Sequence, residues 1–141
     1  MRFWDSSAIV PLVVEEPSSG TCRRWLRQDD EILVWALTRT EVYNAICRRW
    51  HDGSIVAGDF KQAKTKLESL SARWREVQDL LEVRGHAERF CFAHRLRAAD
   101  SLQLGAAWHH AKGKPRKREF VVLDGPLISV AEAEGFNVLT I

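Results

Sequence analysis

The sequence predicts an α/β fold in which a central parallel sheet lies between two layers of helices. Short apolar runs of strand length recur along the chain, and longer stretches whose apolar residues follow a helical spacing separate them. Parallel strands need helical crossovers of this kind, and such crossovers are right-handed. We therefore expect a three-layer α/β/α arrangement with four to five short strands, in a single domain that spans residues 1–141.

Five segments have the composition of strands. The first is the short apolar run over residues 2–5, and the second is the wholly apolar run over residues 32–35. A weaker third strand is expected over residues 76–80. The last two are expected over residues 120–124 and 137–140. These five segments account for the sheet.

The stretches between the strands have helical periodicity. Ser6 and Ser7 can begin the first helix, in which Pro11 keeps every hydrogen bond only if it lies in the first turn. Ser18 or Ser19 can cap the second helix. The expected helices cover residues 6–14, 19–28, 38–50, 55–74, 85–94, 99–111 and 127–134.

Composition and cysteine usage indicate a cytoplasmic protein. The three cysteines, Cys22, Cys47 and Cys91, lack the C-x-x-C spacing of zinc or redox motifs and are odd in number, so we expect free thiols. No apolar run approaches the roughly 18 residues of a membrane span, and no apolar signal core begins the chain. The net charge is only +2, so any binding to nucleic acid must come from local clusters of cations.

Four acids occupy the positions where an open α/β fold builds its sites. Asp5 and Asp124 each end an expected strand, and Glu41 and Asp100 each lie in the first turns of an expected helix. Ligands of such folds bind beyond the carboxyl ends of the strands. Four converging carboxylates repel one another unless a cation holds them, and hard oxygen ligands suit Mg²⁺ or Mn²⁺. The pattern indicates metal-dependent phosphoryl chemistry.

Each of these acids also has a purely structural interpretation. Glu41 has the spacing of a capping box with Thr38, Asp100 can favour the positive end of its helix, Asp5 can cap the helix after it, and Asp124 can belong to a turn. For Glu41 and Asp100 both interpretations stay open. For Asp5 and Asp124 the functional one is favoured, because an acid directly after an apolar strand is costly unless something pairs it.

Competing catalytic motifs are absent from the chain. The sequence contains no phosphate-binding loop of the type G-x-x-x-x-G-K-[ST], no G-x-G-x-x-G and no G-x-S-x-G. His109 and His110 form a pair without a third ligand at recognisable spacing, so we expect them at the surface.

Four segments together match one family. They are D-S-S-A-I-V at residues 5–10, T-E-V-Y-N-A at 40–45, R-A-A-D-S-L-Q-L-G-A-A at 97–107 and V-V-L-D at 121–124. In this order the chain resembles the PIN-domain ribonucleases, and most closely the VapC-type toxins of bacterial toxin–antitoxin pairs. Two positions depart from the pattern: Gln103 stands where many members carry histidine, and Val122 stands where many carry a small hydroxyl residue.

The resemblance implies an endoribonuclease with Mg²⁺ or Mn²⁺ as cofactor. It implies Asp5 and Asp100 as metal ligands, and Glu41 and Asp124 as acids that act at the same metal through water. It also implies a homodimer, and a cognate antitoxin whose tail covers the site.

Neighbouring residues are expected to support the acids and the RNA. Ser6 and Asn44 are placed to orient Glu41, and Arg39, Arg95 and Arg97 are the cations best placed to bind RNA beside the acids. The most basic stretch, residues 112–118, precedes a strand, so we expect it at the opposite edge of the sheet.

Other functions stay open at this stage. A PIN-like scaffold that binds RNA or protein without cutting is one, although it would have no need of all four acids. A phosphohydrolase for a small phosphate ester is another, although the chain lacks a phosphate-gripping loop. A surplus of apolar residues near the start of the chain (Val10, Leu12, Val13, Val14, Trp25 and Leu26) is explained equally by a partner groove or by core packing.

Overall fold

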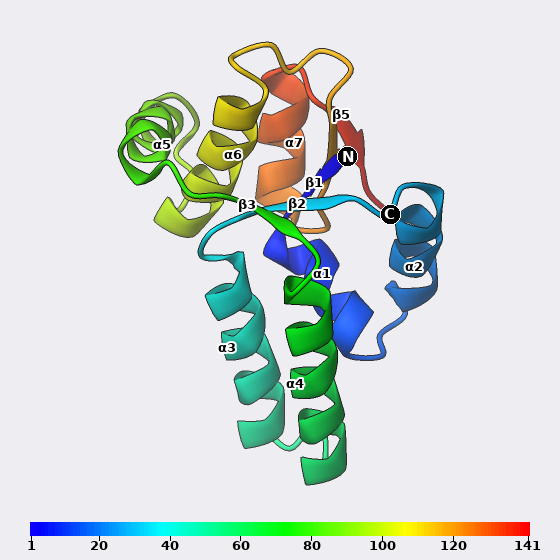
Figure 1. Cartoon of the computed structure of the whole chain (residues 1–141). Helices are drawn as coiled ribbons and strands as arrows, with labels where there is room; N and C mark the ends of the chain where they lie inside the picture. The colour runs from blue at the N-terminus through cyan, green and yellow to red at the C-terminus, as the bar shows by residue number, and fades with distance from the viewer.

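The computed structural model describes residues 1–141 and shows one five-stranded parallel sheet (Figure 1). The strand order across the sheet is β3-β2-β1-β4-β5. The strands are β1 (Arg2–Trp4), β2 (Ile32–Trp35), β3 (Arg75–Val77), β4 (Glu119–Val121) and β5 (Asn137–Leu139). The chain builds the sheet outward from β1 in one direction and then returns to add β4 and β5 on the other side. The order of connections therefore reverses between β1 and β4, which is where α/β sheets open a crevice for ligands.

Helices cover both faces of the sheet, as the three-layer prediction required. They are α1 (Ser6–Val13), α2 (Ser19–Gln28), α3 (Thr38–His51), α4 (Ala57–Ser71), α5 (Leu80–His94), α6 (Ala98–His110) and α7 (Gly125–Ala133). Helices α1 to α4 pack on one face and α5 to α7 on the other. In Figure 1, α3 and α4 lie side by side as a hairpin that extends away from the sheet. No helix has the length and apolar character needed to span a bilayer.

Alternation along the strands supplies the two cores. Trp4 faces the α1–α4 side while its neighbour Phe3 faces the α5–α7 side, and Ile32 and Leu33 divide in the same way. Successive side chains of a strand point to opposite faces, so a strand buried on both faces is apolar throughout. This is why the short runs in the sequence are continuous rather than alternating.

The apolar surplus near the start of the chain belongs to the first of these cores. Val10, Val13, Val14 and Trp25 are buried in it, and the remaining two leucines pack against it. Core packing therefore explains most of these residues, while Leu26 also lines a hollow between α2 and β2.

Several predicted boundaries were wrong. The third strand is Arg75–Val77 rather than 76–80, and α5 begins at Leu80 rather than at Gly85. The predicted strand ended at Leu80, but Leu80 and Leu81 are both exposed on the first turn of the helix. Only Val77 of β3 is buried, so this edge strand carries a weak apolar signal. Helix α4 is also shorter than the predicted 55–74.

The turns around α1 differ from expectation as well. Pro11 lies in the interior of α1, where its missing N–H leaves one helical hydrogen bond unmade. Neither Ser18 nor Ser19 caps α2 through its side chain. Instead the Ser19 hydroxyl donates to the carbonyl oxygen of Val14 and accepts from the amide of Glu16 at 2.8 Å, which ties together the turn between the two helices.

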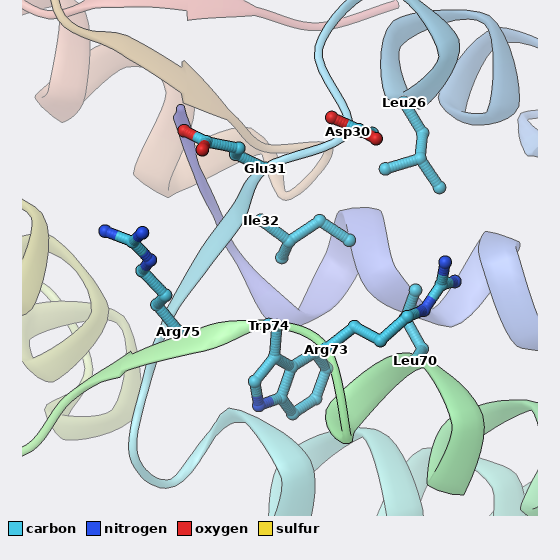
Figure 2. A pocket seen from close by; sticks show the side chains of 8 residues that line it. All are labelled: Leu26, Asp30, Glu31, Ile32, Leu70, Arg73, Trp74 and Arg75. Carbon is cyan, nitrogen blue, oxygen red and sulfur yellow. The ribbon is translucent and has the colours of Figure 1, made fainter.

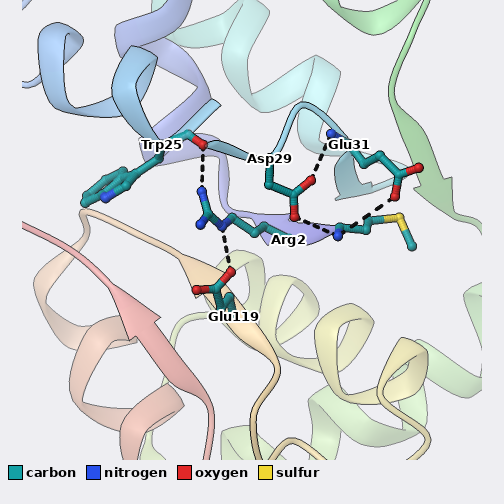
Figure 3. Close-up of polar contacts among 6 residues, drawn as sticks. Arg2, Trp25, Asp29, Glu31 and Glu119 are labelled. Carbon is teal, nitrogen blue, oxygen red and sulfur yellow. Dashed lines mark hydrogen bonds and ion pairs between the residues drawn. The ribbon is translucent and has the colours of Figure 1, made fainter. Parts of the chain in front are cut away.

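At the amino edge of the sheet a buried arginine is paired with an acid (Figure 3). Arg2 Nε donates to Glu119 Oε2 at 2.6 Å, and its Nη1 donates to the carbonyl oxygen of Trp25, also at 2.6 Å. This cluster joins β1, β4 and the end of α2. A buried charge is tolerated when it is paired and hydrogen-bonded in this way.

Candidate active site

The four acids selected from the sequence line one pocket of about 490 Å³ at the carboxyl edge of the sheet. Asp5 directly follows β1, and Asp124 follows β4 and immediately precedes α7. Glu41 lies in the first turn of α3, the helix after β2, and Asp100 lies in the first turn of α6. The reversal of strand order between β1 and β4 brings the four segments together.

Asp5 is almost fully buried, with 3% of its surface exposed. Its Oδ2 accepts a hydrogen bond from the Ser7 amide at 2.9 Å and another from the Ser7 hydroxyl, so it does cap α1. The Ser7 hydroxyl oxygen in turn accepts from the amide of Leu123 at 2.9 Å, which links Asp5 to the segment that carries Asp124. Burial raises the pKa of Asp5 to about 6, against the effect of the Ser7 hydrogen bonds, and the charges of Asp100 and Asp124 raise it further.

Glu41 is held by two neutral donors from different helices. The Ser6 hydroxyl donates to its Oε2 at 3.1 Å, and Gln103 Nε2 donates to its Oε1 at 3.0 Å. The same amide nitrogen of Gln103, which is fully buried, donates to Thr38 Oγ1 at 3.0 Å. Burial and the charge of Asp5 raise the pKa of Glu41 to about 7, while the hydrogen bonds from Ser6 and Gln103 lower it.

The capping-box interpretation of Glu41 is therefore wrong. Leu37, not Thr38, occupies the N-cap position of α3, and it makes no side-chain cap. The hydroxyl of Thr38 and the carboxylate of Glu41 both turn to Gln103 instead.

Asp100 and Asp124 complete the acidic pocket. Burial and the charge of Asp124 raise the pKa of Asp100, and nearby Arg97 opposes that rise. Asp124 occupies the N-cap position of α7, but its side chain makes no capping hydrogen bond. None of the four acids forms an ion pair with a lysine, arginine or histidine. Their charges are offset only by neutral hydroxyl and amide groups and, at longer range, by Arg97.

The cations expected from the sequence lie in three different places. Arg97 lines the acidic pocket, and Arg95 lines an adjoining pocket of about 520 Å³ that also includes Arg97, Asp100 and Asp124. Arg39 does not line either pocket and donates to Ser71 Oγ at 3.1 Å.

Asn44, which was expected to orient Glu41, lines the pocket but makes no hydrogen bond to Glu41. Arg48 lines it too and has no ion-pair partner, while its neighbour Arg49 is paired with Glu16. The basic stretch is at the opposite edge, where Lys117 and Arg118 lie near the start of the sheet.

Sequence reasoning missed four residues that contact or line the site: Ser7, Thr38, Gln103 and Arg48. Helical spacing could have found three of them. Gln103 lies three residues after Asp100, Thr38 lies three before Glu41, and Arg48 lies seven after Glu41, so each shares a helix face with an acid. The role of Ser7 had no such signal, because its second partner is the distant amide of Leu123.

The chemistry of these groups fits a hard divalent cation. Three of the acids have raised pKa values because they are buried close to one another, and an added positive charge would remove that penalty. No three His, Cys, Asp or Glu side chains are already gathered as a metal cage. Mg²⁺ usually binds through one or two carboxylates and keeps several waters, so a ready-made cage is not required.

A second hollow, of about 410 Å³, lies at the opposite end of the strands between α2, β2 and the segment after α4 (Figure 2). Asp30, Glu31, Arg73 and Arg75 line it beside Trp74. It mixes charges of both signs and has no concentration of acids. It therefore lacks the chemistry of the first pocket.

Comparisons with known proteins show the fold and the family of the chain. The solved structure titled "Structure of FitAB bound to IR36 DNA fragment" superposes with a TM-score of 0.62 at 14% sequence identity, over 99% of this chain and 94% of that one. This likeness shows the fold. A search of curated proteins finds no match. The sequence model of the PIN domain matches residues 2–140. Because this match covers almost the whole chain, the chain belongs to the PIN-domain family.

Proposed function

We propose that this PIN domain is a metal-dependent endoribonuclease. The observation that carries the proposal is the gathering of Asp5, Glu41, Asp100 and Asp124 in one pocket, without a single ion-pair partner among them. A protein gains no stability from four unpaired, partly buried carboxylates, since burial of an unpaired charge is costly. The presence of four acids in one pocket is explained if a cation and a phosphodiester occupy it.

Asp5 and Asp100 would hold the Mg²⁺ or Mn²⁺ ion. The ion would supply a lowered pKa for the attacking water and compensation for charge on the phosphate. Glu41, fixed by Ser6 and Gln103, would accept hydrogen bonds from water at the same place. Asp124 has its carboxylate free of any cap, so it can do likewise.

RNA is the proposed substrate because cations flank the acids on an open surface. Arg97 and Arg48 line the pocket and have no ion-pair partner, so both are free to bind backbone phosphates. Arg39 is engaged with Ser71 and lies outside the pocket, so we assign it no part in RNA binding. The resemblance to VapC-type toxins supports RNA as the substrate.

We also propose that the protein is the toxin of a toxin–antitoxin pair, with a cognate antitoxin and a homodimeric, cytoplasmic form. The VapC-like motifs support this proposal. The fold likeness to FitAB, whose structure is bound to a DNA fragment, is compatible with it.

Two other functions are tested by the same experiment. A silent scaffold would bind RNA without cutting it, and a phosphohydrolase would cleave a small phosphate ester but not RNA. The purified protein should cleave mixed-sequence RNA in Mg²⁺ or Mn²⁺, poorly in Ca²⁺, which prefers more ligands in looser geometry. It should be inactive in EDTA, and full activity in EDTA would exclude the metal mechanism. An Asp5→Asn control excludes a contaminating nuclease.

A further inference from the structure

Two pockets meet at the acids. The pocket with Arg48 lies on the α3 side, and the pocket with Arg95 lies on the side of the α5–α6 connection and α7. Arg97, Asp100 and Asp124 line both. The acids therefore occupy the middle of one continuous depression with an unpaired arginine toward each end.

Arg95 has an unusual backbone. It is the residue that ends α5, and it adopts the left-handed conformation with φ 55° and ψ 31°. Glycine is the usual residue at such a helix end, because a Cβ atom is unfavourable in this conformation. Arginine at this position therefore weakens the fold slightly.

The Arg95 side chain offers no structural compensation. It is exposed, forms no ion pair and makes no side-chain hydrogen bond. Its neighbours His94 and Arg89 both contact Glu134, so the local structure is held without it. A positive φ alone marks no site, since Lys112 and Lys117 share it at the opposite edge of the sheet. Only Arg95 among these three lines a pocket that includes two of the acids.

We propose that Arg95 binds a backbone phosphate of a single RNA strand that crosses the acids, on the α7 side of the phosphate that is cut. Arg48 would lie beside the part of the RNA strand on the opposite side of the cut phosphate. This inference rests on the proposed function and adds to it that the substrate extends on both sides of the cleaved bond. Glycine would suit the left-handed backbone at residue 95 better, and the proposed gain from arginine is a guanidinium that binds the RNA strand.

The test compares two matched variants, Arg95→Gly and Lys117→Gly. Each removes one positive charge and relieves one left-handed residue, but only the first changes the depression at the acids. Binding of single-stranded RNA is measured by fluorescence anisotropy in an Asp5→Asn background, where cleavage does not interfere. Arg95→Asn is a second variant, because asparagine also tolerates the left-handed conformation. Thermal melting shows whether each variant folds.

Arg95→Gly should melt at or above the temperature of the parent protein, yet bind RNA about tenfold more weakly, as expected for a lost charge-assisted contact. The slope of log affinity against log salt should fall by about 0.7, the value for one phosphate of a single strand. Lys117→Gly should change affinity by no more than about twofold. An equal loss in both variants would show a general effect of net charge and overturn the proposal.

A second measurement locates the contact. Once the cut bond is mapped, the RNA is shortened one nucleotide at a time from each end. Shortening from one end should weaken binding by the Arg95-containing protein and leave Arg95→Gly unaffected, while shortening from the other end should weaken both. If both proteins respond alike to every truncation, Arg95 does not contact the RNA strand.

Failure of the two proposals can be told apart. Absence of metal-dependent cleavage by the wild-type protein contradicts the proposed function, whatever Arg95 does. Wild-type cleavage together with unchanged RNA binding by Arg95→Gly contradicts only the present inference. A protein that neither cuts nor binds RNA contradicts both.

Discussion

Buried charged side chains have different kinds of partner at the two edges of the sheet. At the amino edge, Arg2 is buried against Glu119 and the carbonyl oxygen of Trp25, so its charge is paired and two of its donors are used. At the carboxyl edge, Asp5 is equally buried but its only partner is Ser7, and Glu41 is held by Ser6 and Gln103, all neutral groups.

This difference separates charges that are neutralised by a partner in the fold from charges that are left without an ionic partner. A paired charge holds elements together and leaves nothing for a ligand. Carboxylates held only by neutral donors keep their direction, and their pKa values are raised because they are buried and no cation compensates them. The same residue types therefore serve stability at one edge and are available for chemistry at the other.

The largest expected effect comes from removing a proposed metal ligand. Asp5→Asn or Asp100→Asn should abolish cleavage of RNA, because each removes a carboxylate that would hold the ion. Neither should unfold the protein, and without metal both should stabilise it by on the order of 1 kcal/mol, because carboxylate repulsion is relieved. Initial rates in Mg²⁺ and chemical denaturation in EDTA measure the two effects. A wild-type rate in either variant would refute the site assignment.

A pair of Glu→Gln changes compares the two edges directly. Glu41→Gln should lower the cleavage rate by orders of magnitude and leave the melting temperature near that of the wild type. Glu119→Gln should do the reverse: it leaves Arg2 without its charged partner and costs about 2 kcal/mol of unfolding free energy, with the rate unchanged. Should the two variants give the same pattern, the division between the edges would not hold.

A smaller effect is expected when only the support of Glu41 is changed. Gln103→Met keeps the volume of the buried side chain but removes both donated hydrogen bonds, to Glu41 and Thr38. We expect a 10- to 100-fold lower kcat, typical for the loss of a group that orients a metal-site residue, with little change in KM. Gln103→His can still donate to Glu41 and serves as the matched control, which should recover part of the rate. A Met variant as fast as the wild type would remove Gln103 from the mechanism.

The last effect is a pH dependence of stability, which changes no contact of the site. The pKa of Asp5 rises from 3.8 to about 6 on folding, and that of Glu41 from 4.5 to about 7. Between these limits the folded protein binds more protons than the unfolded chain, so stability falls as pH rises from about 4 to 7. Other groups titrate too, so the contribution is the difference between wild type and the Asp5→Asn/Glu41→Gln double variant.

Melting temperatures at pH 5 and pH 8 in EDTA measure this difference. The wild type should lose more stability than the double variant over this interval. Saturating Mg²⁺ should reduce the difference, because a bound cation lowers the pKa of its carboxylates. An equal loss in the two proteins would show that these acids do not carry the shifted titration.

Much of the fold could be predicted because local patterns decide it. The apolar run 32–35 is β2 residue for residue, and the alternation of strands and helices predicted a parallel three-layer sheet. The boundaries of β3 and α5 could not be predicted, because β3 is an edge strand with one buried residue and Leu80 and Leu81 are apolar but exposed. The four acids could be selected since each stands at a strand end or a helix start, which are local features.

Only the tertiary structure decided which groups are the hydrogen-bond partners of those acids. Glu41 has the spacing of a capping box, yet it bonds to Ser6 and Gln103, which lie 35 and 62 residues away. Ser7 joins Asp5 to Leu123 across 116 residues, and Arg39 and Arg97 look alike in sequence but only Arg97 faces the pocket. The position of a residue within a helix or strand follows from the local sequence, whereas its hydrogen-bond partner depends on which strands become neighbours. In this chain the return of β4 to the side of β1 brings Asp124 beside Asp5.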